Sequence, residues 1–197
     1  MNVDLSLTTN RGYGPGRPFI VRALWVIAEA LLLVNPIVTS YRLKRVVLRL
    51  FGAGIGGRVI IKPGVHVKYP WRLRVGDNCW LGERCWIDNM EDVTLGDNVI
   101  VSQGAYLCTG NHDWSDPGVG LTPQPIIIED GAWIGAFVRV APGRHIAEES
   151  ILVIGAVSLT DTEPRGIYAG NPAELVRWRT IRDAPGPICQ SEMVVTA

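Results

Sequence analysis

The chain has 197 residues, 47% of them hydrophobic, which is enough for one domain with a substantial core. Its 19 Lys and Arg residues balance 19 Asp and Glu residues, and this zero net charge argues against a nucleic-acid-binding protein. The four cysteines form no CxxC pair, and the first 18 residues lack the pattern of a secretory signal, so we expect a cytoplasmic protein without a zinc ribbon.

The first part of the chain, residues 1–54, is predicted to be a helical segment. Residues 19–39 are strongly apolar, but Arg22, Glu29 and Pro36 interrupt them, which makes them marginal as a membrane span. In the following stretch, SYRLKRVVLRLF, the apolar residues recur at helical spacing after a candidate N-cap, Ser40.

This second helix carries a basic face. Arg42, Arg45 and Arg49 share one side of it, with Lys44 beside them. Such a helix can lie on an anionic membrane surface, or it can pack on its own domain and leave the basic face in solvent. The pattern leaves both readings open, and with them a peripheral contact with the inner face of the cytoplasmic membrane.

After Gly52 an Ile, Leu or Val recurs every sixth residue, with two phase shifts and one loop. Small residues dominate the position four residues after each of these hexad starts. The 14 hexad starts are Ile55, Ile61, Val67, Val75, Leu81, Ile87, Leu95, Val101, Leu107, Ile128, Ile134, Val140, Ile146 and Leu152.

A period of six excludes a helix, because successive hexad starts would drift around its axis. Short strands with a turn every six residues fit it, and three such strands close one coil of a parallel β-solenoid whose coils stack about 4.8 Å apart. We therefore predict an all-β solenoid of about five coils over residues 55–170. Cys79 and Cys85 occupy the small inward position and are expected to be buried thiols.

The regular pattern stops after Leu107 and resumes only at Ile128, and the stretch between them begins CTGNHDWSDPG. A loop that leaves a rigid solenoid often carries function. We expect a flexible loop that presents His112 as a general base, since an imidazole takes up a proton near neutral pH. The other two histidines, His66 and His145, fall at outward hexad positions and are expected to be surface residues.

Several phrases resemble the hexapeptide-repeat acyltransferases, which have a left-handed β-helix. The resemblance is greatest to the maltose/galactoside acetyltransferase-like enzymes and the colanic acid O-acetyltransferases of exopolysaccharide clusters. It covers about residues 20–180, and left-handedness is implied by the resemblance alone. The phrases are LWVIAEALLL, VLRLFGAGIG, VGDNCWLGERCWIDN, TGNHDWSDP, IEDGAWIGAFVRVAPG and IYAGNPAELVR.

The resemblance implies a homotrimer that takes acetyl-CoA as co-substrate, requires no metal, and places each active site between two solenoids. His112 matches the catalytic position and would take the proton from a sugar hydroxyl. A backbone N–H at Gly135–Ala136 of a partner subunit would stabilise the oxyanion. The residues implied beside CoA are Gly135, Ala136, Gly155, Ala156, Thr160 and Arg177.

On the acceptor side the resemblance implies contacts from Asp88 and Asn89, and Trp114 is our choice beside His112. Trp80, Trp86 and Trp133 share the outward hexad position, where they could stack on sugars or be buried in a trimer interface. Residues 171–197 are expected to form a short helix over AELVRWRTIR and a tail, Ala184 to Ala197, without hexads.

The sequence thus predicts an acetyl-CoA-dependent O-acetyltransferase that acts on a saccharide, in exopolysaccharide assembly. The alternatives are a nucleotide-sugar or amino-acid acetyltransferase on the same solenoid, and a non-catalytic solenoid that serves as an interaction module.

Overall fold

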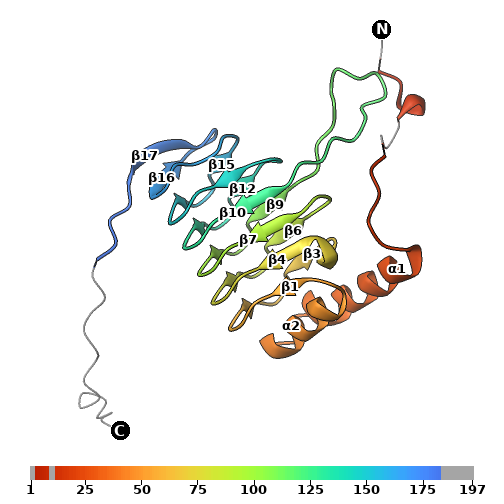
Figure 1. Cartoon of the computed structure of the whole chain (residues 1–197), viewed down its shortest axis with the longest axis horizontal. Helices are drawn as coiled ribbons and strands as arrows, with labels where there is room; N and C mark the ends of the chain where they lie inside the picture. Colours follow the sequence, from red (N-terminus) through yellow and green to blue (C-terminus); the bar gives the residue numbers. More distant parts are fainter. Residues whose placement is uncertain (1–2, 9–11, 183–197) are drawn as a thin grey trace.

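The computed structural model describes residues 3–8 and 12–182, and its centre is a solenoid of short parallel strands (Figure 1). Fifteen strands form five coils, and each coil gives one strand to each of three parallel sheets. Sheet A contains β1 (Gly54–Ile55), β4 (Leu73–Val75), β7 (Val93–Leu95), β10 (Ile126–Ile128) and β13 (His145–Ile146). Sheet B contains β2 (Ile60–Ile61), β5 (Trp80–Leu81), β8 (Ile100–Val101), β11 (Trp133–Ile134), β14 (Ile151–Leu152) and, beyond the coils, β16 (Gly166–Ala169) and β17 (Glu174–Trp178). Sheet C contains β3 (His66–Val67), β6 (Trp86–Asp88), β9 (Tyr106–Cys108), β12 (Arg139–Val140) and β15 (Val157–Ser158).

The core of the solenoid consists of the residues that the hexads predicted to point inward. Each of the 14 hexad starts is at most 7% exposed, and the small residues four positions later, Cys79 and Cys85 among them, are at most 1% exposed. Removing this apolar surface from water, at roughly 25 cal/mol per Å², is the main force that holds the coils together. The predicted solenoid and its inward-facing positions are therefore confirmed.

One corner of the solenoid carries a ladder of aspartates that satisfies backbone groups between coils. Asp77 accepts from the N–H of Gly57, and Asp97 accepts from the N–H of Asp77, both at 2.6 Å. A Cβ atom at Gly76 would overlap the Asp97 carboxylate, so only glycine fits before the aspartate. The repeated Gly-Asp pairs of the sequence thus fix how one coil sits on the next.

Two helices and a π-helical turn cover the end of the solenoid at its first coil (Figure 1). They are α1 (Phe19–Ala28), η2 (Glu29–Leu33) and α2 (Tyr41–Leu50), and two short 3-10 turns are η1 (Leu5–Leu7) and η3 (Pro70–Arg72). Trp25 anchors α1, because it is 1% exposed and its indole N–H donates to the carbonyl of Val67 at 2.8 Å. The predicted N-cap of α2 is confirmed: the Ser40 hydroxyl accepts from the N–H of Leu43. Among the described residues, no helix combines the length and the apolarity that crossing a membrane requires.

Three of the four basic side chains of α2, those of Lys44, Arg45 and Arg49, donate to backbone carbonyls, whereas Arg42 is exposed. Lys44 is fully buried, and its ammonium group donates to two backbone carbonyls at 3.1 and 3.2 Å. Arg45 and Arg49 also donate to carbonyl groups of the first coil. The exposed side of α2 is an apolar one, with Val46 at 49% and Leu50 at 78% exposure. The carbonyls at the open end of the solenoid explain this orientation, because they have no further coil to pair with.

The prediction of a C-terminal helix is wrong. Glu174–Trp178 form β17, which pairs antiparallel with β16 and extends sheet B past the last coil. Pairing with an otherwise open sheet edge outweighs the helical pattern of the sequence, and Val176 and Trp178 are residues that favour strands. The predicted tail, Ala184 to Ala197, lies outside the described residues.

Candidate active site

The break in the hexads forms an arm, residues 109–125, that projects from the solenoid between β9 and β10 (Figure 1). The two sides of the arm pair with each other, since Gln124 N–H donates to the Thr109 carbonyl at 2.9 Å. The N-terminal segment lies against its tip, where Asp4 N–H donates to the carbonyl of Pro117 at 2.9 Å. The arm is therefore a hydrogen-bonded ribbon rather than the open flexible loop that we expected.

His112 lies on this arm with its ring exposed and held by one hydrogen bond. Its Nδ1 is 2.9 Å from the carbonyl oxygen of Val119. A carbonyl only accepts, so the contact requires a proton on Nδ1, and the neutral ring then carries its lone pair on Nε2. A backbone bridge to Leu121 fixes the position of the residue. The arm thus presents a nitrogen that can take a proton from a hydroxyl group.

A groove of about 440 Å³ on sheet B brings together three of the residues expected beside CoA: Gly135, Ala136 and Arg177. Trp133 and Ser102 line the same groove, and the indole N–H donates to the Ser102 hydroxyl at 2.9 Å. The walls are mainly apolar and a guanidinium stands on one side. This combination suits a thin pantetheine chain that ends in phosphates.

The other residues expected beside CoA are not in this groove. Ala156 is fully buried and points into the core, so its side chain cannot touch a ligand outside the solenoid. Gly155 and Thr160 are exposed, but neither is among the described residues that line the groove. Gly135 N–H donates to a carbonyl of the next coil at 2.8 Å, which leaves Ala136 N–H as the candidate oxyanion donor.

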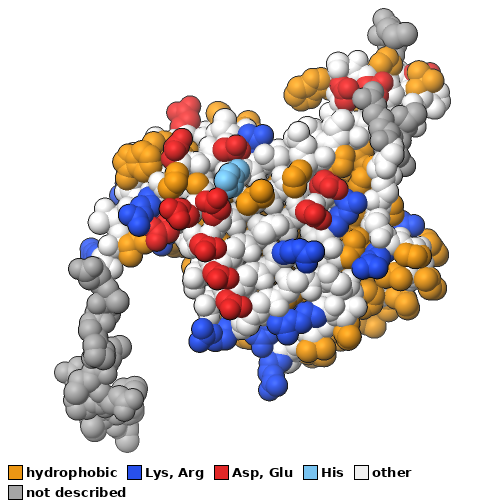
Figure 2. All heavy atoms as spheres, viewed as in Figure 1, with side chains coloured by type: hydrophobic (Ala, Val, Ile, Leu, Met, Phe, Trp, Pro, Cys, Tyr) orange, Lys and Arg blue, Asp and Glu red, His pale blue; other side chains and the backbone are white. Residues whose placement is uncertain are grey.

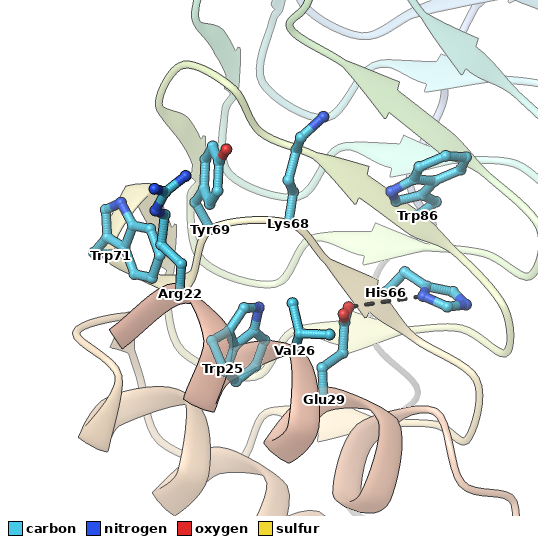
Figure 3. Close-up of a pocket in the computed structure, with 9 residues that line it drawn as sticks. All are labelled: Arg22, Trp25, Val26, Glu29, His66, Lys68, Tyr69, Trp71 and Trp86. Atoms are coloured by element: carbon cyan, nitrogen blue, oxygen red, sulfur yellow. Dashed lines mark ion pairs between the residues drawn. The ribbon is translucent and has the colours of Figure 1, made fainter. Parts of the chain in front are cut away.

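A second hollow, of about 370 Å³, lies between α1 and sheet C (Figure 3). Aromatic rings of Tyr69, Trp71 and Trp86 surround it together with the ammonium group of Lys68. The floor contains an ion pair whose His66 Nδ1 and Glu29 Oε1 are 3.7 Å apart. Aromatic faces with a few charged groups between them suit a polar ligand that also has apolar faces, such as a sugar ring.

Asp88 lies beside this hollow and is held by two neighbours. Its carboxylate accepts from the Lys68 ammonium group and from the Tyr106 hydroxyl, each at 2.8 Å. Burial, and then the contacts with Cys108 and Asp88, raise the pKa of Tyr106 above its usual value, so the phenol stays a donor. Asp88 is 9% exposed, at the edge of the accessible surface.

The other two residues expected at the acceptor differ from Asp88 in accessibility. Asn89 is fully buried, and its side-chain amide both donates to and accepts from the backbone of Tyr69, at 2.6 and 2.9 Å. This gives Asn89 a structural role in place of the acceptor contact that the resemblance implies. Trp114 is 90% exposed on the arm and is free of both hollows.

Lys68 and Tyr106 were missed by the reading of the sequence. They flank Asp88 because sheet C is in register, with Trp86 beside Tyr106 and Asp88 beside Cys108. The spacing between coils predicts both residues as neighbours of Asp88, because side chains about 20 positions apart lie side by side on one sheet.

Sheet B carries an apolar row on its outer face that runs from coil to coil. Trp80, Ile100 and Trp133 are in register and are 42%, 39% and 43% exposed, with Ile60 and Ile151 on either side. A continuous exposed row of this kind is typical of a subunit interface. The groove lies on the same sheet, and none of the described residues that line it comes from the arm. A single chain therefore does not bring His112 to the groove.

Within residues 3–8 and 12–182, no group of three or more His, Cys, Asp and Glu side chains could hold a metal ion. His66 and His145 are exposed, as predicted, and His145 Nε2 lies 2.8 Å from a carboxylate oxygen of Glu129.

Comparisons with known proteins agree with this architecture. Residues 72–108 match the family described as the hexapeptide repeat of succinyl-transferase. The chain is 33% identical over 177 residues to a protein of Escherichia coli (strain K12) named colanic acid biosynthesis acetyltransferase WcaF, an alignment that covers 89% of this chain and 97% of the relative. It is 29% identical over 135 residues to the galactoside O-acetyltransferase of the same organism, with 66% of each chain covered.

Two solved structures show the same fold. A hexapeptide-repeat-containing acetyltransferase of Vibrio cholerae O1 biovar eltor, complexed with acetyl coenzyme A, has a TM-score of 0.74 at 20% identity and covers 81% of this chain and 87% of its own. A galactoside acetyltransferase in complex with coenzyme A has a TM-score of 0.72 at 21% identity, with 90% and 92% of the two chains covered.

Proposed function

The chain belongs to the hexapeptide-repeat acetyltransferases, and on this premise we propose that it transfers an acetyl group from acetyl-CoA to a hydroxyl of a saccharide. Acetyltransferase is the activity named for its relatives, and acetyl-CoA is the co-substrate found with a structural neighbour. The relative with the longest alignment above is named for colanic acid biosynthesis, which supports a role in exopolysaccharide assembly.

His112 is the general base of this proposal. Its Nε2 takes the proton from the acceptor hydroxyl while the oxygen attacks the thioester carbonyl. The tetrahedral intermediate accepts a hydrogen bond from Ala136 N–H, and it then collapses to the acetyl ester with release of CoA as a thiolate that takes up a proton. The bond from Nδ1 to Val119 supports this assignment because it keeps the lone pair on Nε2.

Arm and groove meet only if a second copy of the chain contributes one of them. We propose a homotrimer in which the apolar row of sheet B is buried and the arm of one subunit reaches the groove of the next. A heterologous interface, in which two different faces of the subunit meet, forms a closed ring when the rotation between subunits allows it. Trp80 and Trp133 then serve the interface rather than the sugar.

The saccharide is proposed to lie near Asp88 and Trp114. The hollow between α1 and sheet C offers Trp86 and Lys68 to a sugar ring beside the Asp88 carboxylate. A cytoplasmic location is supported by the unpaired thiols of Cys79 and Cys85, which fit a reducing compartment.

The observation that carries the proposal is the orientation of His112 on the arm, and a conservative substitution tests it. In His112→Asn the amide nitrogen can replace Nδ1 as donor to Val119, while the lone pair of Nε2 is lost. Purified protein would be incubated with acetyl-CoA and a panel of oligosaccharides, nucleotide sugars and amino acids, and the released CoA thiol would be measured.

We expect a rate loss of about 10²- to 10⁴-fold for His112→Asn with unchanged acetyl-CoA binding. His145→Asn, which alters an exposed histidine on sheet A, is the matched control and should keep full activity. Full activity of His112→Asn would refute the assigned base. Turnover with amino acids alone would overturn the saccharide assignment.

A further inference from the structure

The helical end of the molecule exposes an apolar surface that the fold does not use. Ile20, Leu24, Ile27 and Leu31 recur along α1 and η2 and are 52 to 63% exposed. On α2, Val46 is 49% and Leu50 is 78% exposed. We call these six residues the basal apolar surface. Figure 2 shows hydrophobic side chains gathered at this end of the molecule.

The surface is continuous across the two helices. Leu24 of α1 and Leu50 of α2 line one shallow hollow together with Arg17. The helices are held to the solenoid from their other side, where Leu33 and Leu48 are fully buried. Because anchoring is complete without the basal apolar surface, its exposure calls for a partner.

Charge separates this end of the molecule from the rest. Residues 17–76 contain eleven Lys and Arg residues and a single acid, Glu29, whereas residues 77–197 contain seven Lys and Arg residues and seventeen acids. Arg17, Arg42 and Arg58 are exposed near the helices. Figure 2 shows Lys and Arg side chains toward the helical end and acidic side chains along the coils. An anionic surface would therefore attract one end of the molecule and repel the other.

We propose that the basal apolar surface docks on an anionic lipid bilayer. Its aliphatic side chains would enter the interfacial region while Arg17 and Arg42 contact lipid phosphates. A second copy of the chain fits less well, because it would bring two positive ends together. A protein partner also fits less well, because the surface lacks the Trp and Tyr residues that dominate protein-binding hot spots.

Docking has a consequence for the neighbouring hollow. Val26 and Arg22 of α1 line the hollow beside Asp88, so in a docked molecule this hollow would lie close to the lipid headgroups. The proposal goes beyond acetyl transfer, and it can be tested in the absence of acetyl-CoA.

The test is co-sedimentation of the full chain with vesicles of phosphatidylcholine alone and of phosphatidylcholine with phosphatidylglycerol. The variant Leu24→Glu/Ile27→Glu places two charges on the basal apolar surface. Leu159→Glu is the matched control, since Leu159 is 51% exposed, follows β15 and lies in the last coil, away from the helices. Circular dichroism and size-exclusion chromatography verify that each variant keeps its fold and assembly.

We expect the wild type and Leu159→Glu to sediment with the anionic vesicles, less so at high salt and weakly with phosphatidylcholine alone. Leu24→Glu/Ile27→Glu should bind at least about tenfold more weakly. Failure of the wild type to bind anionic vesicles would overturn the proposal, and so would equal binding by the double variant. A change in oligomeric state caused by the double variant alone would assign the surface to a second copy instead.

Discussion

Trp25 is the residue through which α1 holds to the solenoid, and its removal has a calculable effect. Trp25→Ala removes a side chain that is 1% exposed, and truncating a buried Trp typically lowers the free energy of unfolding by about 3–5 kcal/mol. The carbonyl of Val67 also loses its donor at 2.8 Å, which adds about 1–3 kcal/mol if the group stays buried. Trp25→Phe keeps most of the side-chain volume and loses mainly the hydrogen bond, so it should lower the free energy of unfolding by only about 1–3 kcal/mol.

The structure predicts that this loss stays local. Coils of a solenoid are stabilised by their neighbours, so the coils from β7 to β15 do not depend on α1. Hydrogen-exchange mass spectrometry should show that residues 19–33 lose protection in Trp25→Ala and keep most of it in Trp25→Phe, while residues 93–158 are unchanged in both. Wild-type protection of α1 in Trp25→Ala, or loss of protection along the whole solenoid, would refute this reasoning.

Three further predictions concern buried polar groups. Burial raises the pKa of Glu29, so its contribution to stability is complete below its unfolded pKa and is lost as the pH rises through the folded pKa. Glu29→Gln, which can still accept from Val67, should therefore unfold at a higher denaturant concentration than the wild type at pH 7, and this advantage should disappear toward about pH 4. If the stability advantage of Glu29→Gln over the wild type grew in acid, the pKa of Glu29 would not be raised in the folded protein. Burial also raises the pKa of Cys85 to about 12. Iodoacetamide should therefore label Cys85 on the order of 100-fold more slowly than half-buried Cys108, as mapped by mass spectrometry. Equal labelling rates would show that the core opens freely. Lys44→Met leaves the Lys62 carbonyl without its donor, while the Leu33 carbonyl still accepts from the N–H of Gly64. The substitution should lower the free energy of unfolding by about 1–3 kcal/mol in urea titrations. An unchanged midpoint would show that water replaces the ammonium group.

The solenoid could be predicted from sequence because its rule is local and repeated. Each hexad start, from Ile55 to Leu152, has to point inward for any coil to close, so the same signal recurs along most of the chain. The arm that carries His112 was visible as an interruption of that signal. Its pairing with the N-terminal segment was not, since Asp4 and Pro117 are far apart in sequence and carry no shared pattern.

The errors arose where contacts between distant segments decide the outcome. Glu174–Trp178 form a strand because β16 offers an open edge, which no local propensity reveals. Lys44 is buried because the carbonyls of Leu33 in η2 and of Lys62 in the first coil lie within its reach. Asn89 looked available for an acceptor, yet the backbone of Tyr69 in the preceding coil occupies its amide.

Calorimetric titration with acetyl-CoA is the measurement that tests the central claim most directly, because it requires no choice of acceptor. Wild-type protein should bind acetyl-CoA saturably, with close to one site per chain. Ala136→Trp, which fills the groove on sheet B, should abolish binding, whereas Thr94→Trp on the outer face of sheet A should preserve it. Absence of saturable binding by the folded wild type, or unchanged binding by Ala136→Trp, would contradict the assignment of this groove to acetyl-CoA.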